Sequence, residues 1–167
     1  MSRTTKVVIG AVVGFLFLLI VGFSALFMFL NREKEPISAD EFCEIMEDED
    51  FEMVDSVDQY DMIFGEDVVD ESYIALGEDY QIEFLSFSDL DDAKIIYDQQ
   101  CEIFDSLKGN GSKSASTSTS MKNYERYSLT TDGEYKFVAR IDDTMVYADV
   151  DEDYKDEVKE FMEEFGY

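Results

Sequence analysis

The sequence contains no histidine and no tryptophan, and its 167 residues include one proline and two cysteines. Without histidine, the chain has no Ser–His or Cys–His pair, no imidazole metal ligand and no side chain that ordinarily titrates near neutral pH. It also has no glycine-rich phosphate-binding loop. These absences disfavour an enzyme, and we expect neither a catalytic centre nor a cofactor.

Basic residues are scarce, since 13 Lys and Arg face 40 Asp and Glu and the formal net charge is −27 at pH 7. Nucleic acid is therefore disfavoured as a partner, because proteins bind its phosphates through Lys and Arg. Adsorption to anionic lipid is disfavoured for the same reason. Such a surface attracts a basic protein or another cationic partner, and the alternative is an acidic coat that serves solubility alone.

One long stretch has no charge at all, because residues 7–30 form an uninterrupted apolar run. Its 24 residues would reach about 36 Å as a helix, enough to cross a hydrocarbon core of about 30 Å. A cleaved signal peptide has an apolar region of about 7–15 residues and ends in small residues, whereas this run ends in large side chains at 27–30. The run therefore predicts an uncleaved signal anchor, a transmembrane helix within the lipid bilayer.

The Lys and Arg that flank the run are evenly divided, with Arg3 and Lys6 before it and Arg32 and Lys34 after it. The short N-terminal flank contains no acid, and single-pass anchors commonly export a domain of this size. We therefore expect a single-pass protein of the cell membrane with its N-terminus in the cytoplasm and residues 31–167 outside.

The pattern divides the chain into a short flank, a transmembrane helix, a linker and one acidic domain that contains a flexible Ser/Thr loop. The boundaries are residues 1–6, 7–30, 31–36 and 37–167, with the loop at 109–121.

Within the acidic domain, helical and strand patterns alternate. Capping residues and apolar residues at three- and four-residue spacing predict helices over 38–50, 88–109 and 153–165. Alternating apolar residues predict strands over 51–57, 72–76, 80–87, 124–129, 134–141 and 144–150. The order αβββαβββα predicts an α+β fold, an antiparallel sheet with helices packed on one face. We expect the apolar residues of 61–71 to tuck under that sheet, and the alternative is a contact with a partner.

One acidic segment near the C-terminus imitates part of a calcium-binding loop. Counted from Asp149, carboxylates fall at positions 1, 3, 5, 9 and 12, the last two being Glu157 and Glu160. The position that requires glycine for a sharp turn is Tyr154, and Asp151 or Asp153 is placed to cap a helix. We therefore expect no tight metal site here, and a calcium-dependent surface module ranks below a binding domain.

Two further residue pairs have the spacing of a structural contact. Cys43 and Cys101 lie on the apolar stripes of the first two predicted helices, where a disulfide would form if the helices were neighbours, and two buried free thiols are the alternative. Gly10 and Gly14 have the spacing of a helix-dimer face, although glycine is common in membrane spans without that role.

The layout of the anchor, the helix start at 37–42, the segment 80–84 and the final helix start at 154–157 resembles small membrane-anchored proteins of Gram-positive gut bacteria. The resemblance implies a bacterial cell surface and no assigned function, and it transfers no functional residues. We expect an anchored extracytoplasmic domain that binds a basic protein or an envelope component. The alternative is a structural or regulatory subunit that acts through its transmembrane helix.

Overall fold

The computed structural model describes residues 21–22, 33–108 and 114–167. The chain divides into two units, Met1–Glu33 and Lys34–Tyr167. The apolar run falls in the first unit, where only two of its residues are described, so Gly10 and Gly14 lie outside the described residues. Among the residues that are described, no helix is long and apolar enough to cross a bilayer.

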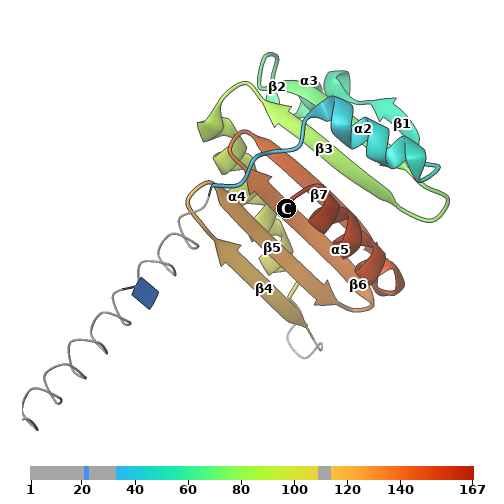
Figure 1. The fold of residues 1–167 in the computed structure, drawn as a ribbon, viewed down its shortest axis with the longest axis vertical. Helices are drawn as coiled ribbons and strands as arrows, with labels where there is room; N and C mark the ends of the chain where they lie inside the picture. Colours follow the sequence, from blue (N-terminus) through green and yellow to red (C-terminus); the bar gives the residue numbers. More distant parts are fainter. Residues whose placement is uncertain (1–20, 23–32, 109–113) are drawn as a thin grey trace, which may run out of the picture. The chain divides into compact units, whose positions relative to one another are not determined.

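The second unit is a seven-stranded antiparallel sheet with helices packed against it (Figure 1). In chain order its elements are α2 (Ala39–Asp48), β1 (Glu52–Asp55), α3 (Val57–Phe64), β2 (Val69–Leu76), β3 (Gln81–Phe87), α4 (Leu90–Ser106), β4 (Ala115–Ser120), β5 (Tyr124–Thr131), β6 (Glu134–Ile141), β7 (Thr144–Asp151), a 3₁₀ turn η1 (Glu152–Tyr154) and α5 (Lys155–Glu164). The strand order is β1-β2-β3-β7-β6-β5-β4. The predicted α+β class and antiparallel sheet are confirmed, whereas the predicted order αβββαβββα was wrong because it lacked helix α3 and strand β4.

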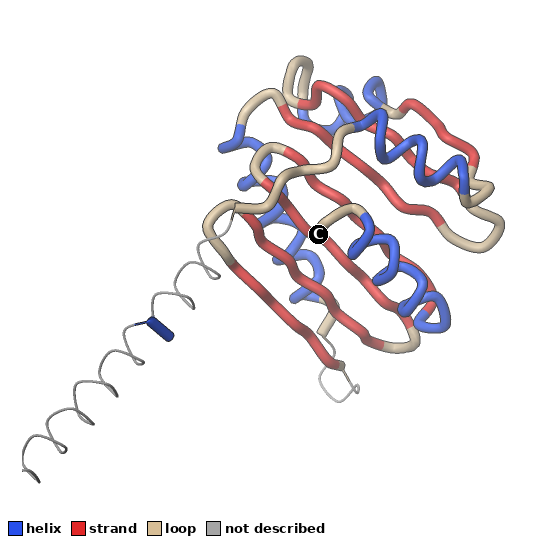
Figure 2. The backbone as a smooth tube through the Cα atoms, viewed as in Figure 1, coloured by secondary structure: helices blue, strands red, loops and turns tan. Residues whose placement is uncertain are grey.

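Helices cover both faces of the sheet, so the prediction that they pack on one face was wrong (Figure 2). One core lies between the sheet and helices α2 and α5, and a second lies between the sheet and helices α3 and α4. The reason is visible in β6, where Phe137 and Val138 point to opposite faces and both are buried. The sequence pattern hid this burial because Lys136 and Arg140 share the face of Val138.

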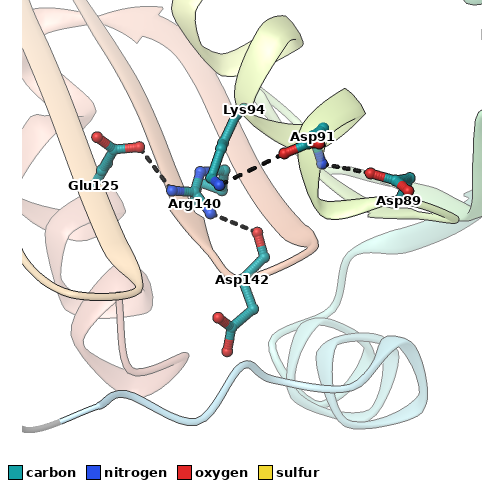
Figure 3. A network of polar contacts seen from close by, with 6 residues as sticks. All are labelled: Asp89, Asp91, Lys94, Glu125, Arg140 and Asp142. Carbon is teal, nitrogen blue, oxygen red and sulfur yellow. Dashed lines mark hydrogen bonds and ion pairs between the residues drawn. The ribbon is translucent and has the colours of Figure 1, made fainter.

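Those two cations are buried because each has a carboxylate partner. Lys136 Nζ lies 2.6 Å from Asp149, and Arg140 Nη2 donates to Glu125 Oε2 at 2.7 Å (Figure 3). Buried charges are tolerated when they are paired and hydrogen-bonded. The face of β6 that the sequence pattern predicts to be solvated is therefore buried and contains ion pairs.

Helix α2 begins as its sequence predicts. The Ser38 side chain accepts a hydrogen bond from the Glu41 N–H at 3.2 Å, which satisfies one of the free donors of the first turn. Phe42 is fully buried, and its ring stacks on that of Phe84 in β3 with centroids 5.3 Å apart. The N-cap and the apolar stripe of α2 thus fix this helix over β1, β2 and β3.

The segment 61–71 does not tuck under the sheet as a whole. Its first part completes helix α3, in which Met62 and Ile63 are 82% and 60% exposed. Phe64 is partly buried against the core beside α4, and Val69 is fully buried at the start of β2. The prediction was therefore wrong for the two most exposed residues, because a short helix turns them outward.

Residues 115–120, expected to belong to a flexible loop at 109–121, form the edge strand β4. The strand pairs with β5 from Ala115 opposite Thr130 to Ser120 opposite Glu125. The Met121 N–H donates to the Tyr124 carbonyl at 2.7 Å and closes a tight turn between the strands. This backbone pairing, rather than side-chain burial, orders the segment.

The linker is held to the domain from Lys34 onward. The Lys34 N–H donates to Asn123 Oδ1 at 3.0 Å, and Asn123 Nδ2 donates to the Lys34 carbonyl at 2.8 Å. Lys34 Nζ also donates to the Gly166 carbonyl at 2.6 Å. The Asn123 side chain thus hydrogen-bonds both backbone groups of Lys34. Together with the Gly166 contact, it holds the first residue of the domain beside the C-terminus.

Candidate functional site

One hollow of the described surface is acidic and lies at one end of the sheet. It has a volume of about 630 Å³ and is lined by the turn after β2 and by the ends of β6 and β7. Its carboxylates include Glu78, Asp79, Glu134 and Asp149. Both oxygens of Asp149 accept hydrogen bonds from Lys136 Nζ at 2.6 Å, so this carboxylate neutralises a buried cation.

The residues of the calcium-like segment have structural partners. Asp151 Oδ1 accepts from the Asp153 N–H at 3.0 Å and caps η1. The Tyr154 ring packs against Tyr80 with centroids 5.0 Å apart, which places an aromatic contact where a calcium loop needs glycine. In the described part of the chain, no three His, Cys, Asp or Glu residues are grouped so that they could hold a metal ion.

The two cysteines cannot form the disulfide considered above, because the sheet separates them. Cys43 in α2 borders one core, and Cys101 in α4 borders the other. Both are free thiols. The error follows directly from placing all helices on one face of the sheet.

Alkylation should therefore label two cysteines in the denatured, unreduced protein. In the native state we expect slow labelling at pH 8, because burial raises the pKa of the Cys101 thiol to about 11 and also raises the pKa of Cys43. Mass spectrometry after treatment with an alkylating reagent gives the number of labels. The control is a sample reduced before alkylation, which should have the same labelled mass as the unreduced sample. Labels that appear only in the reduced sample would show a disulfide and contradict free thiols.

A different part of the domain carries the features of an interaction surface, namely β4 and the adjoining side of β5. All six β4 side chains are exposed or partly exposed. On the α5 face, no described helix lies over these two strands (Figure 1). β4 has no charged residue, whereas every other described strand has at least one.

Beside this uncovered area, a groove of about 250 Å³ runs between α5 and β5. Its lining residues are Thr117, Arg126, Ser128, Tyr135, Phe137, Lys159, Met162 and Glu163. Cations and hydroxyl groups thus predominate in its polar lining, which is unusual for a chain with a formal net charge of −27. The groove reaches the edge strand itself, because Thr117 of β4 is among its lining residues.

Neither the β4 edge nor the groove is clearly indicated by the sequence. Threonine favours strands, and alternating Ser and Thr at 115–120 was the available signal, but serine-rich composition is also typical of linkers. Arg126 and Lys159 come from a strand and a distant helix, so nothing in their spacing indicates that they line one groove.

These observations define a three-layer domain with an antiparallel sheet, two cores and one incompletely covered edge. The chain matches no family model, no curated protein and no solved structure. The fold and its surfaces are therefore the basis for a functional proposal.

Proposed function

We propose that this chain is a single-pass membrane protein that displays a non-catalytic binding domain outside the cytoplasm. The domain binds an extended segment of a partner protein, which adds to the sheet as a strand beside β4. The observation that carries this proposal is the edge strand β4, which is free of charge and pairs with no described strand on its outer side.

Edge strands expose N–H and C=O groups that pair readily with another chain, and proteins usually protect them with charge, proline, a bulge or short length. The opposite edge, β1, has four residues and carries Glu52 and Asp55. β4 has six residues, regular pairing to β5 and none of these protections. Strand addition is a recurring mode of peptide recognition that uses such an edge.

The backbone geometry identifies which donors face outward. Hydrogen-bonded and non-hydrogen-bonded pairs alternate along an antiparallel ladder, and the Met121–Tyr124 pair is hydrogen-bonded. Ser118, opposite Tyr127, is three positions before Met121 and falls in a non-hydrogen-bonded pair. The Ser118 N–H therefore points away from β5, toward an added strand.

Charge favours a foreign partner over a second copy of the chain. Two molecules that each carry a formal charge of −27 repel each other. A protein of opposite net charge, or one bound to a cationic envelope component, is attracted over a distance of about 8–10 Å at moderate salt. The acidic surface then speeds the encounter, and the β4 edge supplies the backbone hydrogen bonds.

The test uses full-length protein in nanodiscs and a displayed library of short random peptides. Selected peptides should slow hydrogen exchange at the β4 amides, and Ser118→Pro should abolish their binding because proline removes an outward donor. Ser118→Thr keeps the N–H and is the matched control. Peptides that bind Ser118→Pro as well as the original chain, or that protect only helical amides, would overturn strand addition.

A second arm separates the binding domain from a subunit that acts through its membrane helix. Residues 7–30 are replaced by an unrelated apolar helix, and crosslinking in native membranes is compared between the two proteins. A binding domain keeps its crosslinked partner. Loss of that partner on replacement of the helix, with peptide binding retained, would favour the membrane-acting alternative.

A further inference from the structure

The basic residues of the acidic domain are unevenly placed, and several lie along the groove between α5 and β5. Arg126 and Lys159 line the groove itself. At one end, Lys155 Nζ donates to Thr130 Oγ1 at 2.9 Å and lies 5.3 Å from the centroid of the Tyr135 ring. At the other end, Lys34 Nζ lies 3.8 Å from the centroid of the Tyr124 ring. Lys159 Nζ also pairs with Asp156 Oδ1 at 2.9 Å. The groove therefore gathers cations on a strongly negative molecule, and Arg126 supplies the positive charge within it that has no carboxylate partner in the described part of this domain.

Arg126 differs from the cations on the opposite face of the same strands. Lys136 and Arg140 are buried and are each matched by a carboxylate, Asp149 and Glu125 respectively. Arg126 is half-buried and, within residues 34–108 and 114–167, it forms no ion pair with a carboxylate. With 40 acidic residues in the chain, an unmatched guanidinium in a groove is the exception that needs an explanation.

The remaining lining suits an anion. Thr117, Ser128 and Tyr135 supply hydroxyl groups that can donate hydrogen bonds. Glu163 is the one carboxylate of the lining, and Lys159 lies one helical turn before it on α5. Phe137 and Met162 form the apolar part of the lining and reduce the competition from water.

The electrostatic environment agrees with this geometry. Burial raises the pKa of Tyr135, whereas a hydrogen bond with Ser128 and the charges of Lys159 and Arg126 lower it. Burial lowers the pKa of Lys34, and the charge of Arg126 lowers it further. In both cases the charge of Arg126 acts in the direction that also favours a negative charge bound nearby.

We infer that the groove is a binding site for a single oxyanion group, a carboxylate or a phosphate, held by the guanidinium of Arg126 and the neighbouring hydroxyls. A guanidinium presents a planar fork of donors that matches both groups. The volume of about 250 Å³ is below the range of about 300–1,000 Å³ that is usual for drug-sized ligands. A small head group or side chain fits this size, and the site does not depend on strand addition at β4.

The experiment titrates inorganic phosphate, and separately acetate, into full-length protein in a neutral maltoside detergent. Backbone NMR shifts at Thr117 and Ser128 report binding, and the two probes distinguish phosphate from carboxylate recognition. Arg126→Gln should weaken the preferred anion by about ten- to hundredfold, the usual effect of losing a charged hydrogen-bond partner. Arg126→Lys should weaken it less, because the charge remains.

Lys94→Gln is the matched control, since it removes the same charge from an exposed side chain on α4, away from the groove. It should leave the affinity within about twofold, because salt screens exposed charges beyond about 10 Å. Equal weakening by Lys94→Gln and Arg126→Gln would reduce the effect to net charge and overturn the site. Absence of saturable shifts with both probes would also overturn it. If Arg126→Gln fails to fold, Thr117→Val removes one hydroxyl donor and should weaken binding in the same titration.

Discussion

Phe84→Ala is expected to lower the free energy of unfolding by about 3–5 kcal/mol, the range found when a buried phenylalanine is truncated. Phe84 is fully buried in β3, and its ring stacks on that of Phe42 in α2. The substitution therefore leaves a cavity between the sheet and α2. A domain of this size is stable by about 5–15 kcal/mol in total, so the loss is a large part of its stability.

Urea denaturation of the full-length chain, followed by far-ultraviolet circular dichroism, measures this loss without a tryptophan probe. Met62→Ala is the control, since Met62 is 82% exposed on α3. It should change the free energy of unfolding by no more than about 0.5 kcal/mol. Similar losses for the two variants would contradict the assignment of Phe84 to the core.

Glu125→Ala is expected to cost about 3 kcal/mol, at the lower end of the range for breaking a buried ion pair. The lower end applies because the pair is only partly buried: the Arg140 side chain is 4% exposed, but the Glu125 side chain is 29% exposed. After the substitution, Arg140 retains a hydrogen bond to the Asp142 carbonyl at 2.6 Å but loses its carboxylate (Figure 3). The cost is that of a buried charge without a counter-ion.

The double variant Glu125→Ala/Arg140→Met should recover most of the stability, because an apolar side chain of similar length removes the unmatched charge. Arg140 Nε already has no hydrogen-bond partner in the described structure, which lowers the cost of removing this residue. Lys94→Gln breaks the exposed pair with Asp91 in the same region and should cost less than about 1 kcal/mol. A double variant less stable than Glu125→Ala would show that Arg140 stabilises the fold through contacts other than its ion pair.

Local signals in the sequence were sufficient for the starts of α2 and α4 and for two hairpins, but they did not predict helix α3. The Ser38 and Asp89 side chains both cap helices where the sequence places them, because capping depends on residues only a few positions apart. The turn at 77–79 and the pair β6–β7 were predicted for the same reason. These elements required no knowledge of the tertiary structure.

Features that depend on distant partners could not be predicted in this way. Lys136 and Arg140 alternate with apolar residues and so indicate a solvated face, until α4 and two carboxylates from other strands are brought to them. β4 consists of residues with no apolar pattern, and its order comes from β5. The groove combines α5 with β5, whose side chains meet only after the sheet has formed.

The hydrogen bonds between Asn123 and Lys34 determine how a pulling force would pass through the domain. Asn123 lies in the turn between β4 and β5, and Lys34 is also bonded to the last turn of the chain through Gly166. If a membrane holds the chain before Lys34 and a partner holds β4, tension between them enters and leaves the domain on the same side of the sheet. The force path then runs through the Asn123–Lys34 hydrogen bonds and the β4–β5 hairpin, and it does not cross the sheet to β1 and β2.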